Sequence, residues 1–316
     1  MTHALALADF GSFFAGGRPV KIEGESSRTV AFTRTASLPY DPNGHYHFEQ
    51  AYVQYFIPAH RTQPLPLVLL HGGGMTGAMW ENTPDGRPGW LQHFLHLGHA
   101  VYVVDNVERG RAGWAPFESV WSESPVIRNA EESWSLFRFG RAEDFVRREG
   151  FKGQRFPLGA FDTFIQHAVP RWIGNNDAAL RGLCAVLERV GPCLLVAHSH
   201  GGEVAFRALK EKPDLVRGVI GIEPSGFAEP IRSKTVAGKP ILLMYGDYLN
   251  ATPLWERLVV AGREYANTLQ SKGGDIETWW LAEMGIHGNS HMLMMDDNNG
   301  ELARRVSQWV LARFSF

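Results

Sequence analysis

The sequence contains only two cysteines in 316 residues, which excludes a fold held together by several disulfides. Cys184 lies in a segment with the apolar spacing of a helix, and Cys193 begins a short apolar run typical of a buried strand. We therefore expect two separate, packed thiols rather than a disulfide, which favours a reducing compartment.

An excess of charge of one sign is also missing. The 31 Lys and Arg residues are offset by 33 Asp and Glu residues, which leaves a formal net charge of −2. A chain so close to neutral has no long-range field to attract nucleic acid or an anionic membrane surface, so neither is expected as a partner. A small-molecule ligand is favoured instead.

Long apolar runs are missing as well. The longest, such as 67–70 and 100–104, have the length of a strand, far below the roughly 20 residues that span a bilayer. Residues 1–10 show neither the basic start nor the apolar stretch of a secretory signal, so the sequence predicts a cytoplasmic protein. A secreted or periplasmic protein trimmed of its signal would look the same.

Apolar residues make up 44% of the chain, enough to form a buried core. Short apolar runs typical of buried strands alternate with helical patterns over 67–104 and again from 177 to the C-terminus. This alternation predicts an α/β fold with a doubly wound, mostly parallel sheet. No linker is apparent, so we expect a single domain over 1–316.

Residues 111–176 interrupt the alternation and are dense in aromatic side chains. We interpret this segment as a cap inserted in the domain, whose aromatic residues either line a ligand pocket or form the cap's own core. A pocket of this kind favours a hydrophobic ligand over a small anionic one. The aromatic residues include Trp114, Phe117, Trp121, Trp134, Phe137, Phe139, Phe145, Phe151, Phe156, Phe161, Phe164 and Trp172.

A serine lies in a strand-to-helix turn, in the motif Val196-Ala197-His198-Ser199-His200-Gly201-Gly202. Such a nucleophile elbow needs small residues two positions before and after the serine, because the turn brings their backbones close together. Ala197 and Gly201 meet this need, although glycine is the usual residue at the first position. A metal cluster that begins with the two histidines is the alternative, but the aspartate and histidine that it requires do not follow. No metal is therefore expected.

The glycine loop His71-Gly72-Gly73-Gly74 follows the apolar run 67–70. An α/β hydrolase, the fold in which such a serine elbow is typical, places its oxyanion hole at this point. A tetrahedral oxyanion must come within about 2.7–3.1 Å of backbone N–H groups, and side chains would obstruct that approach. We expect the donors to be Gly73, Gly74 and His200, the residue after the serine. A phosphate-binding loop is the alternative, but the lysine of a Walker loop is missing.

The base in this fold lies in a loop after the last strand, where the sequence has His287 and His291. His291 is favoured, because it directly precedes the closing helical pattern. Two acids each follow a strand: Glu223 after the sixth and Asp247 after the seventh. Position alone favours Asp247, because the acid most often follows the seventh strand.

Several segments together resemble a small group of bacterial serine esterases within the α/β-hydrolase superfamily, over roughly Val68 to the C-terminus. Members of that group carry a glutamate after the sixth strand as the triad acid, which implies Glu223 here. The resemblance also implies a homodimer, and the aromatic insertion is its least matched part. The segments are His71-Gly72-Gly73-Gly74-Met75-Thr76-Gly77, Trp80-Glu81-Asn82-Thr83-Pro84-Asp85-Gly86-Arg87, Asp105-Asn106-Val107-Glu108-Arg109-Gly110-Arg111, Ile222-Glu223-Pro224 and Gly288-Asn289-Ser290-His291-Met292.

Together these features predict a serine esterase or lactonase that acts on a small hydrophobic ester through an acyl-enzyme, without a cofactor. Ser199 attacks the carbonyl carbon, His291 transfers the proton, and Glu223 orients the imidazole. Two alternatives stay open. One is a lactone-forming or transesterifying acyltransferase with the same triad, and the other is a receptor that keeps a hydrolase pocket to bind a small ligand without catalysis.

Overall fold

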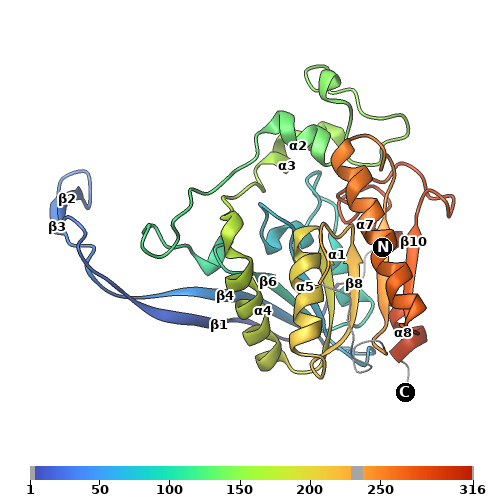
Figure 1. Ribbon diagram of the computed structural model, residues 1–316, viewed down its shortest axis with the longest axis horizontal. Helices are drawn as coiled ribbons and strands as arrows, with labels where there is room; N and C mark the ends of the chain where they lie inside the picture. The colour runs from blue at the N-terminus through green and yellow to red at the C-terminus, as the bar shows by residue number, and fades with distance from the viewer. Residues whose placement is uncertain (1–3, 229–237, 315–316) are drawn as a thin grey trace.

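The computed structural model describes residues 4–228 and 238–314. Within them, eight strands form one sheet in the order β1-β4-β6-β5-β7-β8-β9-β10 (Figure 1). The pairs from β6 to β10 are parallel, whereas β4 pairs antiparallel with both β6 and β1. The predicted α/β fold with a mostly parallel sheet is confirmed. The sheet strands are β1 (Leu7–Ile22), β4 (Gly44–Pro58), β5 (Leu67–Leu70), β6 (Val101–Asp105), β7 (Cys193–His198), β8 (Val216–Ile222), β9 (Ile241–Tyr245) and β10 (Ile276–Trp280).

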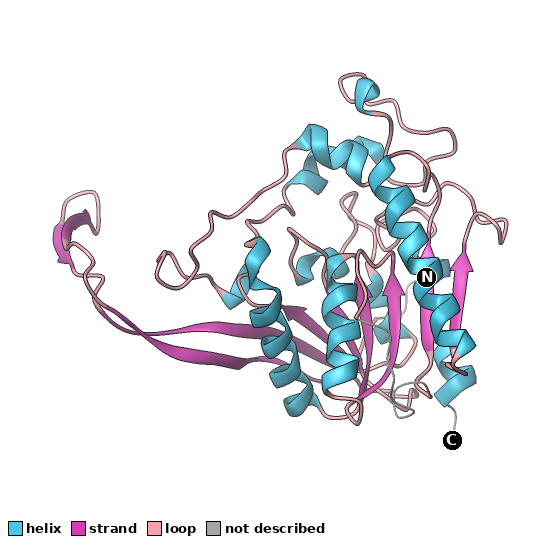
Figure 2. Ribbon diagram, viewed as in Figure 1, coloured by secondary structure: helices cyan, strands magenta, loops and turns pink. Residues whose placement is uncertain are grey.

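Helices cover both faces of this sheet (Figure 2). On one face, α4, α5 and α7 contribute Leu183, Val204 and Leu269 to a buried cluster. On the other, α1 and α8 contribute Phe94 and Val306. No described helix is long and apolar enough to span a bilayer. The helices are α1 (Trp90–His96), α2 (Ala130–Leu136), α3 (Phe161–Ile165), α4 (Asn176–Val190), α5 (His200–Glu211), α7 (Pro253–Ser271) and α8 (Asn299–Phe314).

The central strands are buried on both sides, which explains why they are apolar without a break. Every residue of β5 and of β7 is buried. Full burial of one aliphatic side chain is worth about 1.5–3 kcal/mol, so these short strands contribute strongly to stability. Cys193 is buried in β7 and Cys184 is partly buried in α4, and both are free thiols, as the sequence predicted.

The edge of the sheet carries a long antiparallel hairpin formed by β1 and β4. The two strands run side by side from the pair Leu7 and Pro58 to the pair Ile22 and Gly44. The hairpin projects beyond the other strands and ends in a small ribbon of β2 (Arg28–Ala31) and β3 (Ser37–Tyr40) (Figure 1). We call residues 7–58 the β1–β4 arm.

Residues 111–176 lie beyond the carboxyl ends of the strands and contain α2 and α3 (Figure 1). Their aromatic side chains pack mainly on one another: Trp134 and Phe161 meet edge to face at 5.2 Å, as do Phe139 and Phe164. These rings are continuous with the core under α1 and α8. Most of the aromatic residues therefore stabilise the segment itself, which we call the cap segment.

Candidate active site

Ser199 occupies the turn between β7 and α5 with φ 51° and ψ −121°. A non-glycine residue in such a conformation costs about 1–3 kcal/mol, so the surrounding structure must hold it. The Ser199 N–H donates to the Ile222 carbonyl at 2.9 Å, and the Ser225 N–H donates to the Ser199 carbonyl at 3.1 Å. The end of β8 thus holds the backbone of the elbow in place.

The glycines after Ser199 are required by close packing. A Cβ on Gly201 would lie 2.5 Å from the His71 carbonyl oxygen, and one on Gly202 would lie 2.5 Å from the Cβ of Pro224. Neither position has room for a side chain. The elbow is therefore enclosed by the glycine loop on one side and by the segment after β8 on the other.

The glycine loop lies directly against the elbow. A Cβ on Gly72 would be 3.3 Å from the Cβ of Ser199, and one on Gly73 would be 3.5 Å from the Cβ of His200. Among the described residues, the N–H groups of Gly73 and Gly74 have no acceptor. The imidazole Nε2 of His200 bonds to the Asn176 Oδ1 at 2.8 Å, so its side chain is held by α4. The structure thus brings the three expected oxyanion donors to one loop cluster beside Ser199.

His291 and Glu223 are joined by a buried hydrogen bond. The Nδ1 of His291 lies 2.6 Å from the Oε2 of Glu223, and both side chains are at most 2% exposed. The imidazole stacks on Phe137, with ring centroids 5.5 Å apart, and contacts Trp255 with centroids 4.4 Å apart. The hydrogen bond to Glu223 and the contacts with Phe137 and Trp255 therefore hold the imidazole ring in place.

No hydrogen bond joins the Ser199 hydroxyl to His291 among the described residues. The two segments are linked through His198, whose Nε2 bonds to the His291 carbonyl oxygen at 3.0 Å and whose ring centroid lies 4.4 Å from that of His291. Hydrogen bonds between nucleophile and base are often long without substrate and shorten when it binds. His291 is thus placed next to the elbow by His198, the residue before Ser199.

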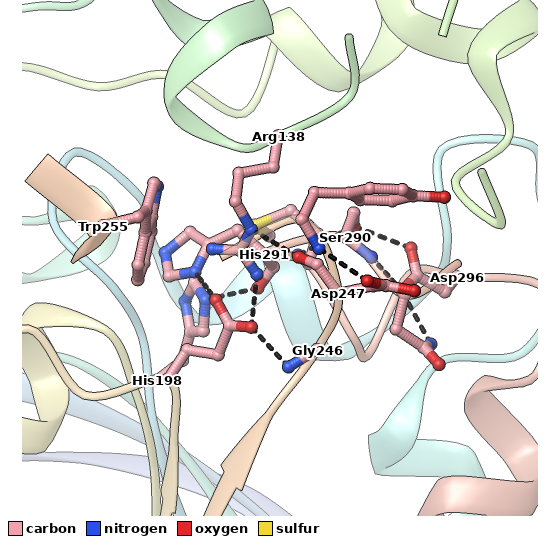
Figure 3. A network of polar contacts seen from close by, with 12 residues as sticks. Arg138, His198, Gly246, Asp247, Trp255, Ser290, His291 and Asp296 are labelled. Atoms are coloured by element: carbon pink, nitrogen blue, oxygen red, sulfur yellow. Dashed lines mark hydrogen bonds and ion pairs between the residues drawn. The ribbon is translucent and has the colours of Figure 1, made fainter. Parts of the chain in front are cut away.

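Glu223 stays ionised although it is fully buried. Burial by itself would raise its pKa, but the charge of Arg138 and the contacts with His291 outweigh this and lower the pKa to about 2. The Gly246 N–H also donates to Oε1 at 2.6 Å, and Arg138 donates to the same oxygen (Figure 3). The carboxylate therefore contributes stability above its unfolded pKa near 4.5, and this is lost as pH falls through about 2.

Arg138 was missed by the sequence analysis. It follows α2 in the cap segment with φ 59°, is 0% exposed, and donates through Nε to the Asp247 carbonyl at 2.8 Å. Its guanidinium also lies over the Trp255 ring, 4.2 Å from the centroid. A lone arginine between Phe137 and Phe139 was a usable signal, because a charge buried among aromatic rings requires a partner.

The alternative acid and the alternative base contact each other rather than His291. The Asp247 carboxylate accepts from the Tyr248 and Gly288 N–H groups, at 2.8 and 3.0 Å. His287 lies 3.7 Å from Asp247, and its side chain is 69% exposed. Asp247 therefore has the contacts of a turn residue that caps local backbone.

A second buried carboxyl group supports the loop that carries His291. Asp296 accepts hydrogen bonds from the Asn289 amide, the Ser290 N–H and the Ser290 hydroxyl, at 2.7–2.8 Å (Figure 3). Burial raises the pKa of Asp296 to about 7, although the donors from Ser290 and Asn289 oppose this. No periodic pattern in the sequence singles out this residue.

Beside the site lies a pocket of about 490 Å³, part of it open to solvent. It extends from the glycine loop to the cap segment, and Phe137, which stacks on His291, forms part of its wall. We call it the glycine-loop pocket. Its lining consists of Gly73, Gly74, Met75, Val126, Arg128, Ser133, Phe137, Phe164, Ile165, Ala168, Arg171 and Ile173. Among residues 4–228 and 238–314, no three His, Cys, Asp or Glu side chains are grouped so as to hold a metal ion.

Replacing Arg138 by methionine should change the pH dependence of ester hydrolysis at the candidate site as well as the stability of the protein. Burial lowers the pKa of His291, Glu223 opposes this, and the charge of Arg138 adds to the lowering, so loss of Arg138 should move the rising limb of kcat/KM toward higher pH. Because a buried carboxylate is left without its cation, the free energy of unfolding should fall by about 3–5 kcal/mol. Arg138→Lys should restore part of the pH profile and part of the stability. Kinetics from pH 5 to 9 measure the pH profile, and melting curves measure the stability.

The matched control is Arg141→Met, which removes an exposed arginine from the same segment. It should leave both the pH profile and the melting temperature close to those of the parent protein. An Arg138→Met variant that loses stability but keeps the parent pH profile would show that Arg138 stabilises the cap segment without acting on His291.

Comparison with known proteins identifies the family. No family model matches the chain. The solved structure of a bacterial esterase is 30% identical, with a TM-score of 0.86 over 100% of this chain and 99% of that one. A curated fungal protein (Fungal sp., strain ATCC 74256) named "Probable secreted lipase phiG" is 28% identical over 341 residues, which is 90% of this chain and 92% of that protein.

The expected cytoplasmic location is wrong on this comparison, because the fungal relative is named as secreted and points to secretion instead. The expectation came from the composition of residues 1–10 and from the two free cysteines, neither of which identifies a compartment directly. The expected fold and activity class agree with both relatives. Similarity that extends over the full length of a bacterial esterase, at 30% identity, is shared ancestry rather than a shared motif. The chain therefore belongs to the α/β-hydrolase family and, within it, to the carboxylic-ester hydrolases.

Proposed function

We propose that this ester hydrolase acts through an acyl-enzyme, with Ser199 as nucleophile, His291 as base and Glu223 as the acid that orients His291. The observation that carries the proposal is the buried hydrogen bond between Glu223 and His291, next to a serine in a strained strand-to-helix turn. This arrangement supports a catalytic triad in which substrate binding completes the hydrogen bond between Ser199 and His291.

In the first half of the reaction, the Ser199 Oγ attacks the ester carbonyl carbon while His291 Nε2 accepts the hydroxyl proton. The carbonyl oxygen becomes an anion and accepts hydrogen bonds from the N–H groups of Gly73, Gly74 and His200. The tetrahedral intermediate collapses, His291 returns the proton to the leaving alcohol, and the acyl group stays on Ser199. Water repeats these steps and releases the acid.

The electrostatic environment suits His291 for this role. Burial lowers its pKa, although Glu223 opposes the shift, so the imidazole is neutral and able to accept a proton at neutral pH. Once protonated, the imidazolium is stabilised by the ionised Glu223 at 2.6 Å. We therefore expect kcat/KM to rise with pH, with a midpoint below the ordinary pKa of histidine.

The substrate that we propose is a small ester or lactone with a hydrophobic part. The glycine-loop pocket offers an apolar wall that includes Phe137, Phe164 and Ile165. The cap segment, residues 111–176, supplies these three side chains. It is therefore a cap inserted in a single domain that spans residues 1–316. No described feature specifically favours the acyltransferase or the non-catalytic receptor.

Replacing Ser199 by alanine should lower kcat by on the order of 10⁶, because only binding and the oxyanion donors remain. The measurement is hydrolysis of a p-nitrophenyl ester, combined with labelling by a fluorophosphonate and a melting curve. Ser271→Ala, at the end of α7, is the control and should be labelled and active like the parent. A folded Ser199→Ala protein that keeps a tenth of the activity would mean that another residue attacks the ester.

We also propose that two copies of the chain associate through the β1–β4 arm. The ribbon of β2 and β3 has only four residues per strand, and Phe32, in the turn that joins them, is 72% exposed. An isolated two-stranded ribbon is marginally stable in water, and a second copy would supply the missing contact surface.

The arm can be shortened without changing the sheet, because Ile22 and Gly44 are paired residues. Joining them by an Asn-Gly turn replaces residues 23–43 with a connection that suits a hairpin. Light scattering after gel filtration should give a dimer for the parent protein and a monomer for the shortened one, with esterase activity in both. A parent protein that is monomeric at micromolar concentration, or a shortened protein that stays dimeric, would contradict this assembly.

A further inference from the structure

The glycine-loop pocket is not apolar throughout. Arg128 and Arg171 both contribute to its lining, next to Gly73 and Gly74 of the glycine loop. The mechanism above uses neither arginine. A hydrophobic ester would offer neither cation an acceptor, and Arg171 is the more buried of the two.

The Arg171 guanidinium has no partner in the described part of the chain. Its Nε is buried without a hydrogen bond, and no ion pair is formed by the side chain. Burial lowers the pKa of Arg171, although the more distant carboxylates of Glu108 and Glu203 oppose this. Glu108 is itself already engaged, because it accepts from the Arg109 side chain, the Trp172 N–H and the Asn175 amide.

The position of Arg171 is fixed by its backbone. Its N–H donates to the Val126 carbonyl at 2.9 Å, and the Val126 N–H donates back at 2.8 Å. The next residue, Trp172, is bound to Glu108, and Val169 donates to the Gly74 carbonyl at 2.9 Å. The side chain of Arg171 therefore starts from a rigid segment that is tied to the glycine loop.

The guanidinium lies directly against that loop. A Cβ on Gly73 would be 2.7 Å from the Arg171 Nη1, so glycine at this position makes room for the cation as well as for the oxyanion. Arg128 forms an ion pair with Glu132 on the surface, and its positive charge repels that of Arg171. An anion in the pocket would relieve this repulsion and supply the acceptors that the guanidinium lacks.

We propose that the glycine-loop pocket binds a carboxylate group of the substrate, and that Arg171 is the residue that pairs with it. The inference rests on the proposed esterase function and narrows its substrate class to esters that also carry a free acid. The apolar wall at Phe137 and Ile165 then contacts the carbon chain between the ester and the acid. This differs from the sequence-based expectation that anionic substrates are disfavoured.

The test compares two esters that differ at the end remote from the p-nitrophenyl group: the mono-p-nitrophenyl ester of adipic acid, which is anionic there, and its methyl ester, which is neutral. For the parent protein, kcat/KM should be at least tenfold higher on the anionic ester. In Arg171→Gln this ratio should fall by about 10- to 100-fold, as expected for a lost hydrogen bond to a charged group. Arg171→Lys should retain part of the ratio, and 0.5 M NaCl should reduce it.

Arg304→Gln is the matched control, because it removes one cation from the exposed side of α8. It should leave the ratio unchanged, whereas a similar fall in this variant would attribute the preference to net charge. An Arg171→Gln variant that loses activity equally on both esters would overturn the proposal and place Arg171 at the reacting carbonyl. Cleavage of neither ester by the parent protein would instead count against the proposed function.

Binding without turnover gives an independent readout. Adipate itself should bind to Ser199→Ala, measured by calorimetry, and should compete with the neutral ester in the parent protein. The double variant Ser199→Ala with Arg171→Gln should bind adipate at least tenfold more weakly. Equal binding by both proteins, with unchanged melting curves, would show that the carboxylate is not held by Arg171.

Discussion

The buried Glu223 carboxylate is the constraint on which the rest of the site depends. A carboxylate without exposure to water is costly unless strong donors surround it, and here Arg138, the Gly246 N–H and His291 all donate to it. Loss of one partner from such a buried pair typically costs about 3–5 kcal/mol, because the remaining charge cannot be solvated. The orientation of His291 and the ionisation of Glu223 are therefore set by the same few contacts.

This network also connects the two parts of the molecule. Arg138 comes from the cap segment, whereas Glu223 follows β8 and Gly246 follows β9. The guanidinium bonds to the Asp247 carbonyl and covers Trp255 of α7, so the cap segment is held to the sheet by the group that keeps the carboxylate charged. A change in the position of the cap segment would alter the pKa of His291 through Arg138.

The sequence was most informative where a local pattern determines structure. Uninterrupted apolar runs predicted β5 and β7, because strands buried on both faces need apolar residues throughout. The crowded turn around Ser199 required small residues, which made the elbow recognisable. By contrast, β1 is glycine-rich and mostly exposed, Arg138 pairs with Glu223, and Arg171 lies against Gly73, each far from its neighbour in the chain. Such long-range pairs leave no periodic pattern, so only the folded structure brings them together.

The role of Glu223 is tested most directly by comparing two isosteric variants, Glu223→Gln and Asp247→Asn, at equal stability. If Glu223 orients His291, Glu223→Gln should lower kcat by on the order of 10⁴, because an amide favours the wrong tautomer and cannot stabilise the imidazolium. Asp247→Asn, whose carboxylate contacts only backbone groups and the exposed His287, should cost far less. Both are measured on one neutral p-nitrophenyl ester, with melting curves to exclude unfolding. An inactive Asp247→Asn beside an active Glu223→Gln would contradict the account and place the acid after β9.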